Sequence, residues 1–184
     1  HPDLADRVDP CEGVTCAHEA ASSHGSHVAG VLLGDNSTME LDAWGFYRGM
    51  GVAPSATFIE QRFSPWGETV GGFYTLMSDS AANGASISVN AWGTSSTPVG
   101  YDLYTRMADV GVRDAMSDLE GNQSLTWVLS FMNGYGGTST QGAPDEAKNI
   151  LTVGSTEMRS STGWQSGQLD DLSSNSAHGP ALDG

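Results

Sequence analysis

A histidine lies where a helix is expected to begin, among residues small enough for that helix to pack closely. The segment HGSHVAG occupies residues 24–30, directly after a Ser22-Ser23 pair whose hydroxyls can cap a helix. A free imidazole has a pKa of about 6.5, so a histidine can accept and return a proton near neutral pH. His24 is therefore a candidate general base, and the alternative is a histidine that only caps the helix.

Short apolar runs of strand length alternate along the chain with segments that can form helices. The expected strands are residues 57–63, 85–91, 124–131 and 150–155, and the expected helices are residues 24–33, 69–82 and 101–119. Apolar residues expected on one face of the last two helices are Phe73, Leu76 and Met77, and then Leu103, Met107, Val110, Val112, Met116 and Leu119. This alternation predicts an α/β fold with a parallel sheet and right-handed crossovers.

Two polar segments fall at the carboxyl ends of expected strands, where parallel sheets bind their ligands. Residues 90–93 lie at the carboxyl end of the second strand, and Asn133 follows the third. Each has a purely structural alternative. Trp92 can be a core aromatic, and Asn133 can adopt a left-handed turn at a strand end.

The order of several short motifs resembles the subtilisin-like serine proteases (subtilases) over nearly the whole chain. The motifs are HPDL at 1–4, HGSHVAG at 24–30, GVAP at 51–54, SVNAWG at 88–93, MNG at 132–134, KNILTVG at 148–154 and residues 173–184. The resemblance implies a three-layer α/β fold, with a mostly parallel sheet and helices on both faces. It also implies that residues 1–184 are a single, incomplete catalytic domain.

In that family the first histidine of the motif is the base of an Asp-His-Ser triad, so the resemblance gives His24 this role. His27 matches a structural position, where we expect a packed, hydrogen-bonded side chain. Asn133 matches the asparagine whose amide donates to the oxyanion of the tetrahedral intermediate. Removing such a donor from a subtilisin lowers turnover by about 10²–10³-fold.

The resemblance also implies substrate-binding residues. Ala91-Trp92-Gly93 matches a segment whose backbone pairs with an extended peptide, and Gly93 leaves room for that approach. We include the preceding Asn90 and also Met132 in this group. The family usually has small residues before the oxyanion asparagine, so Phe131-Met132 is expected to narrow the pocket for the substrate's P1 side chain.

Two family segments have no match in this sequence. The D-[ST]-G turn with the catalytic aspartate would precede His1, and the G-T-S-M turn with the nucleophile would follow Gly184. Gly137-Thr138-Ser139 lacks the methionine and comes too early in the motif order. We therefore expect the 184 residues to be inactive alone. The alternative to a serine endopeptidase is a non-catalytic subtilase-like fragment or pseudoenzyme that binds peptides or partners.

The charge balance is strongly acidic, with 22 Asp and Glu against 7 Lys and Arg and a formal net charge of −15. Nucleic acids and anionic membranes need a basic face, so neither is an expected partner. The expected partner is a peptide or protein substrate, and the oligomeric state is left open. The family resemblance implies an extracellular or cell-envelope location.

No cofactor is expected for the chemistry, although Asp3 matches a position that binds structural calcium in some subtilases. Cys11 and Cys16 enclose four residues, and a local disulfide is the favoured reading for a secreted protein. Two free thiols, or a zinc site with His18, are the alternatives. His18 and His24 do not have the spacing of an HExxH motif.

Overall fold

The computed structural model describes residues 1–184 except 17–21, 96, 136 and 158–170. The chain divides into two compact units, His1–Arg62 and Phe63–Gly184.

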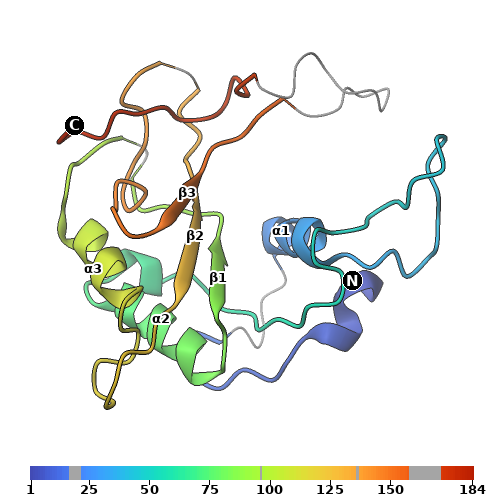
Figure 1. Ribbon diagram of the computed structural model, residues 1–184, viewed down its shortest axis with the longest axis horizontal. Helices are drawn as coiled ribbons and strands as arrows, with labels where there is room; N and C mark the ends of the chain where they lie inside the picture. The colour runs from blue at the N-terminus through green and yellow to red at the C-terminus, as the bar shows by residue number, and fades with distance from the viewer. Residues whose placement is uncertain (17–21, 96, 136, 158–170) are drawn as a thin grey trace. The chain divides into compact units, whose positions relative to one another are not determined.

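The first unit contains a short 3-10 helix, η1 (Pro2–Arg7), and the helix α1 (Ser23–Leu33) (Figure 1). The Ser22 hydroxyl caps α1 by accepting a hydrogen bond from the Gly25 N–H at 3.1 Å. The helix ends at Gly34, where a Cβ would overlap the carbonyl oxygen of Gly49. The helix expected over residues 24–33 is thus confirmed, and a second backbone segment passes close to the glycine that follows it.

The strand expected over residues 57–63 does not form. Phe58 makes a single parallel bridge to Val8, and Gln61 makes a single antiparallel bridge to Cys16. One bridge is parallel and the other is antiparallel, and they join different partners. No two consecutive residues therefore pair with the same segment. The apolar run is extended chain without a sheet partner of its own.

The aromatic residues of the loop after α1 also differ from expectation. The sequence suggests that they cover the edge of a core, but Trp44, Phe46 and Tyr47 are each more than two-fifths exposed. The Asp42 carboxylate accepts from the backbone N–H groups of Trp44 and Phe46, and Leu41 bridges Tyr47. This local turn projects the aromatic side chains to the surface.

The second unit is built on a parallel sheet with the strand order β1 (Ile87–Asn90), β2 (Thr126–Ser130) and β3 (Leu151–Val153). Figure 1 shows α2 (Gly72–Ala82) and α3 (Leu103–Gly111) beside each other next to this sheet. A 3-10 turn, η2 (Trp66–Glu68), precedes α2. The parallel α/β architecture expected from the strand–helix alternation is confirmed.

One face of the sheet joins the two helices in a single hydrophobic core, because Trp127 and Leu125 point toward them. Its buried members are Phe73, Met77, Met107, Ala108, Val112, Ala115, Leu125 and Trp127. Trp127 also donates its indole N–H to the Ser88 hydroxyl at 3.0 Å, which links β2 to β1. The opposite face stays open within this unit, with Ile87, Val89, Leu151 and Val153 all more than two-fifths exposed.

The third expected helix is shorter than the sequence pattern suggests. It begins after Asp102, whose carboxylate accepts from the Thr105 N–H at 2.8 Å, and it ends at Gly111. A Cβ at Gly111 would overlap the sulfur of Met77, so α2 and α3 meet closely at this point. Residues 112–119 form turns, and Leu119 is exposed although it was expected on the apolar face.

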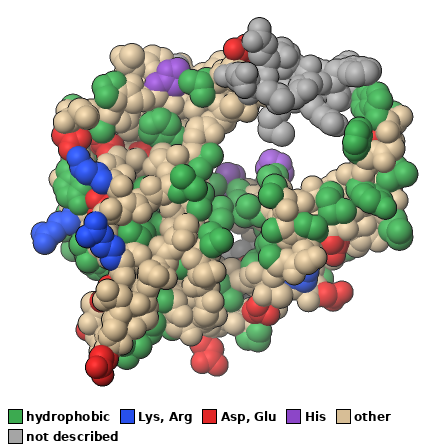
Figure 2. All heavy atoms as spheres, viewed as in Figure 1, with side chains coloured by type: hydrophobic (Ala, Val, Ile, Leu, Met, Phe, Trp, Pro, Cys, Tyr) green, Lys and Arg blue, Asp and Glu red, His purple; other side chains and the backbone are tan. Residues whose placement is uncertain are grey.

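Surface composition agrees with the acidic sequence. Figure 2 shows Lys and Arg side chains over only small areas of the face in view, among Asp, Glu and many apolar atoms. Among the described residues, no helix is long and apolar enough to cross a membrane.

Candidate active site

His24 is the second residue of α1 and is exposed, at the end of the helix where the backbone N–H groups point outward. The Ser22 cap fixes where this first turn, which carries His24, begins. His27 lies one turn later and is also exposed, so the expectation of a packed side chain is wrong. The small residues and the helix cap predict where His24 lies, but they do not predict whether His27 is buried.

Asn133 belongs to the second unit and follows β2 closely, at the carboxyl end of the sheet. Its backbone bridges Ser176 in an antiparallel sense, and the Ala177 N–H donates to the Met132 carbonyl at 2.9 Å. A Cβ on the next residue, Gly134, would meet the Ala177 backbone at 2.7 Å. The Asn-Gly pair thus allows the segment around Ser176 to run directly beside Asn133.

The Asn133 side chain is exposed, and one end of its amide is held. The Nδ2 of Asn175 donates to the Oδ1 of Asn133 at 3.2 Å. The Oδ1 of Asn175 in turn accepts from the hydroxyls of Ser173 and Ser155. The Nδ2 of Asn133 donates to no acceptor within the described part of the chain. Asn175 is not among the site residues expected from the sequence, although it lies in the polar run of residues 173–176.

The two segments that leave β1 and β2 meet at Gly93 and Met132. A Cβ at Gly93 would overlap the Met132 sulfur and lie 3.0 Å from its terminal methyl and 3.3 Å from the Ala143 carbonyl. The Ala143 carbonyl also accepts from the Thr94 N–H at 2.9 Å. Met132 therefore occupies the space that the missing Gly93 side chain leaves open.

The other residues proposed for substrate binding have structural partners. Asn90 is buried and donates its side-chain N–H to the Ser88 hydroxyl at 3.0 Å. The Trp92 ring stacks on Phe63 at 4.7 Å between centroids and contacts Phe73 and Trp127 edge-on. The ring of Trp92 is therefore a packed aromatic of the core, which is the structural alternative given for it above. Pairing with a peptide would use only the backbone of residues 91–93.

Two grooves flank the sheet of the second unit. One, of about 300 Å³, is lined by Glu68, Thr94, Ser95, Val99, Asp102, Tyr104 and Ala143, of which Thr94 directly follows Gly93. The other, of about 580 Å³, is larger but lies at the amino ends of the strands, beside Ser86, Ser124 and Asn149. Since parallel sheets bind ligands at their carboxyl ends, the smaller groove has the better position.

A buried carboxyl group lies in the loop that contributes Ala143. Asp145 is only 5% exposed, and neither of its carboxylate oxygens has a hydrogen-bond partner among the described residues. Burial raises the pKa of Asp145 to about 7, and the neighbouring Glu146 adds to that rise, while the backbone N–H groups of Gly142 and Asp145 act in the opposite direction. The adjacent Glu146 is also buried but accepts from the N–H groups of Val99, Gly100 and Leu182.

The structure gives the predicted calcium ligand a different partner. The Asp3 carboxylate accepts from both the backbone N–H and the hydroxyl of Ser37. The described residues contain no group of three His, Cys, Asp or Glu side chains that could hold a metal ion. Calcium at Asp3 stays a prediction from the sequence.

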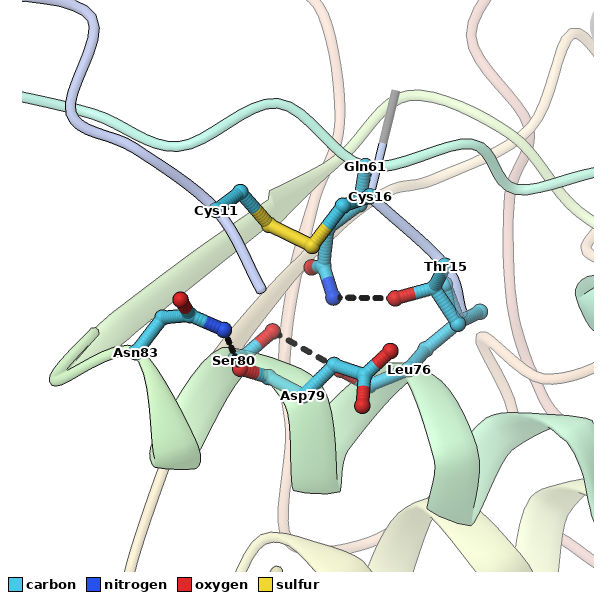
Figure 3. Close-up of a disulfide and its surroundings, with 8 residues drawn as sticks. All are labelled: Cys11, Thr15, Cys16, Gln61, Leu76, Asp79, Ser80 and Asn83. Atoms are coloured by element: carbon cyan, nitrogen blue, oxygen red, sulfur yellow. Dashed lines mark hydrogen bonds between the residues drawn. A yellow bond between two sulfur atoms is a disulfide. The ribbon is translucent and has the colours of Figure 1, made fainter. Parts of the chain in front are cut away.

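Cys11 and Cys16 form a disulfide with 5.7 Å between their Cα atoms, the pairing favoured from their spacing (Figure 3). Next to it, the Gln61 side chain donates to the Thr15 hydroxyl at 2.8 Å. His18, the third ligand of the alternative zinc site, lies outside the described residues. Because both thiols are oxidised in the disulfide, they are not available for zinc.

His24 thus belongs to the first unit and Asn133 to the second. The Asn133 region has an exposed amide at the carboxyl edge of a parallel sheet, next to Met132, whose side chain fills the space beside Gly93. The His24 region presents an imidazole at the start of a capped helix.

No curated protein matches the sequence. The fold is similar to the solved structure of Sphericase, with a TM-score of 0.59 and 22% sequence identity over 96% of this chain. The chain spans 54% of the length of that structure. The family model of the subtilase family matches residues 2–183, and the chain therefore belongs to this family.

Proposed function

We propose that this chain is part of a serine endopeptidase of the subtilisin type, which cleaves peptide bonds through an acyl-enzyme. The observation that carries the proposal is the Asn133 amide. It is exposed at the carboxyl edge of the sheet, its oxygen accepts from Asn175, and its Nδ2 donates to no acceptor among the described residues. Family membership supports the class of chemistry.

In this mechanism the imidazole of His24 takes the proton of a serine hydroxyl as the hydroxyl attacks the scissile carbonyl. It then returns the proton to the leaving amine. The carbonyl oxygen becomes negatively charged in the tetrahedral intermediate, and the Asn133 amide donates to it there. We assign the triad aspartate and the nucleophilic serine to no residue of this chain.

The substrate is expected to bind as an extended strand along the backbone of residues 91–93. The Cys11–Cys16 disulfide supports a location outside the reducing cytosol, because such bonds persist in oxidising compartments. Structural calcium at Asp3 remains part of the proposal.

Labelling of the native protein with a fluorophosphonate tests the proposal, because this probe reacts only with an activated serine. We expect labelling of the wild-type protein and its loss in His24→Ala. The matched control is His27→Ala, which removes an exposed imidazole from the same helix and should still be labelled. Absence of labelling in a folded wild-type sample would instead favour a non-catalytic peptide-binding relative.

A further inference from the structure

Asn133 can donate to an oxyanion only if its amide has the correct orientation. The oxygen and nitrogen of a primary amide have nearly the same shape, so hydrogen bonds decide which one faces the substrate. In an exposed side chain the two orientations would otherwise exchange freely. A group that accepts from or donates to one end of the amide therefore controls the donor at the other end.

We infer that Asn175 is a positioning residue that holds the Asn133 amide with its N–H groups toward the substrate. Its Nδ2 donates to the Oδ1 of Asn133 at 3.2 Å, which leaves the Nδ2 of Asn133 on the opposite side. This inference rests on the proposed oxyanion role of Asn133 and assigns a new residue to the same site.

The orientation of Asn175 itself is set by two hydroxyl groups. Ser173 and Ser155 both donate to its Oδ1, the latter at 3.4 Å. With its oxygen occupied in this way, Asn175 presents its N–H groups to Asn133. The two serines thus orient the Asn175 amide, and Asn175 in turn orients the Asn133 amide.

The backbone keeps the two asparagines beside each other. Tyr135 donates its N–H to the Asn175 carbonyl at 3.3 Å, and Asn133 bridges Ser176. Ser176 is buried, and its hydroxyl accepts from the Ser155 N–H at 3.2 Å. The segment that carries Asn175 is therefore tied both to the end of β2 and to the residues after β3.

A double-mutant cycle on peptide hydrolysis by the complete protein tests this inference, with kcat and KM measured separately on a chromogenic peptide anilide. Asn133→Ala should lower kcat by about 10²–10³-fold. Asn175→Ala should lower kcat by about 3–10-fold with little change in KM, as expected for one hydrogen bond that orients the donor. In the Asn133→Ala background, the second substitution should have no further effect.

An equal loss from Asn175→Ala in both backgrounds would overturn the inference, because it would show a general structural role. An increase in KM alone, or unchanged kcat, would overturn it as well. Asn122→Ala is the control, because Asn122 is exposed and lies before β2, whereas Asn133 follows that strand.

Asn175→Asp provides a second variant if the alanine protein is unstable. It keeps the acceptor for the two serine hydroxyls but replaces the N–H donor with an oxygen. Asn133 must then turn its own N–H groups toward residue 175, so kcat should fall further than in Asn175→Ala. Wild-type kcat in this variant would overturn the inference. If neither His24→Ala nor Asn133→Ala alters hydrolysis, the proposed function itself is wrong and the positioning role falls with it.

Discussion

Replacing Asp145 with asparagine should stabilise the protein at high pH and have little effect at low pH. The folded protein keeps this carboxyl group buried without a hydrogen-bond partner among the described residues, which raises its pKa from 3.8 to about 7. In the unfolded chain the same group is in water and loses its proton near its ordinary pKa of about 4. Asparagine has nearly the same shape and carries no charge at any pH.

The sign of the effect follows from proton binding. Below about pH 4 both states hold the proton, so Asp145 does not reduce stability. Between about pH 4 and pH 7 the unfolded state has lost its proton while the folded state retains it, so the free energy of unfolding falls as pH rises. Above about pH 7 the charged group is buried in the folded state, and the loss is complete.

The size of the effect follows from the two pKa values. One pKa unit corresponds to about 1.36 kcal/mol, so a rise from 3.8 to about 7 gives a loss of about 4 kcal/mol. Water that reaches the carboxylate reduces this figure, and we expect about 2–4 kcal/mol at pH 8. This is a large share of the stability of an ordinary domain.

Urea denaturation followed by tryptophan fluorescence measures the effect, since the chain contains five tryptophans and Trp127 is buried. Unfolding free energies of wild type and Asp145→Asn are compared at pH 4 and pH 8. Asp118→Asn is the matched control, because it removes the same charge from an exposed position and so accounts for the acidic surface. The reasoning is refuted if Asp145→Asn is no more stable than wild type at pH 8.

Three further substitutions test other contacts. Glu146→Gln should lower the unfolding free energy by about 1–3 kcal/mol, because the amide NH₂ would face backbone N–H donors that the carboxylate oxygens now accept from. The same urea titration measures this loss. Glu120→Gln is the control, because Glu120 is exposed and its substitution should be neutral. Gly111→Ala should cost about 1–3 kcal/mol and lower the melting temperature in calorimetry, since the new Cβ overlaps the Met77 sulfur; an unchanged melting temperature would show that the helices separate freely. Met132→Gly should shift cleavage toward larger P1 side chains in a peptide library, and an unchanged preference would mean that Met132 does not line the pocket.

The sequence alone predicted those features that depend on local chemistry and on motif order. Ser22 and the small residues after His24 predict a capped helix, and the helix forms from Ser23 to Leu33. Alternating apolar runs predict a parallel sheet, and three of the four expected strands join it in chain order. Asn133 was located at the carboxyl edge of this sheet because a strand and a glycine flank it. The close spacing of two cysteines also favoured their disulfide.

Other features depend on contacts between residues far apart in the chain, which no local pattern contains. Residues 57–63 have the composition of a strand but lack a continuous partner, and Gly111 of α3 packs against Met77 of α2 where no side chain would fit. Asn175 contacts Asn133 across 42 residues, and Asp145 acquires its high pKa only because the fold buries it. The sequence determined which groups are available for chemistry. The tertiary structure decided their orientation and their charge, because hydrogen-bond direction and burial are set by neighbours that only folding brings together.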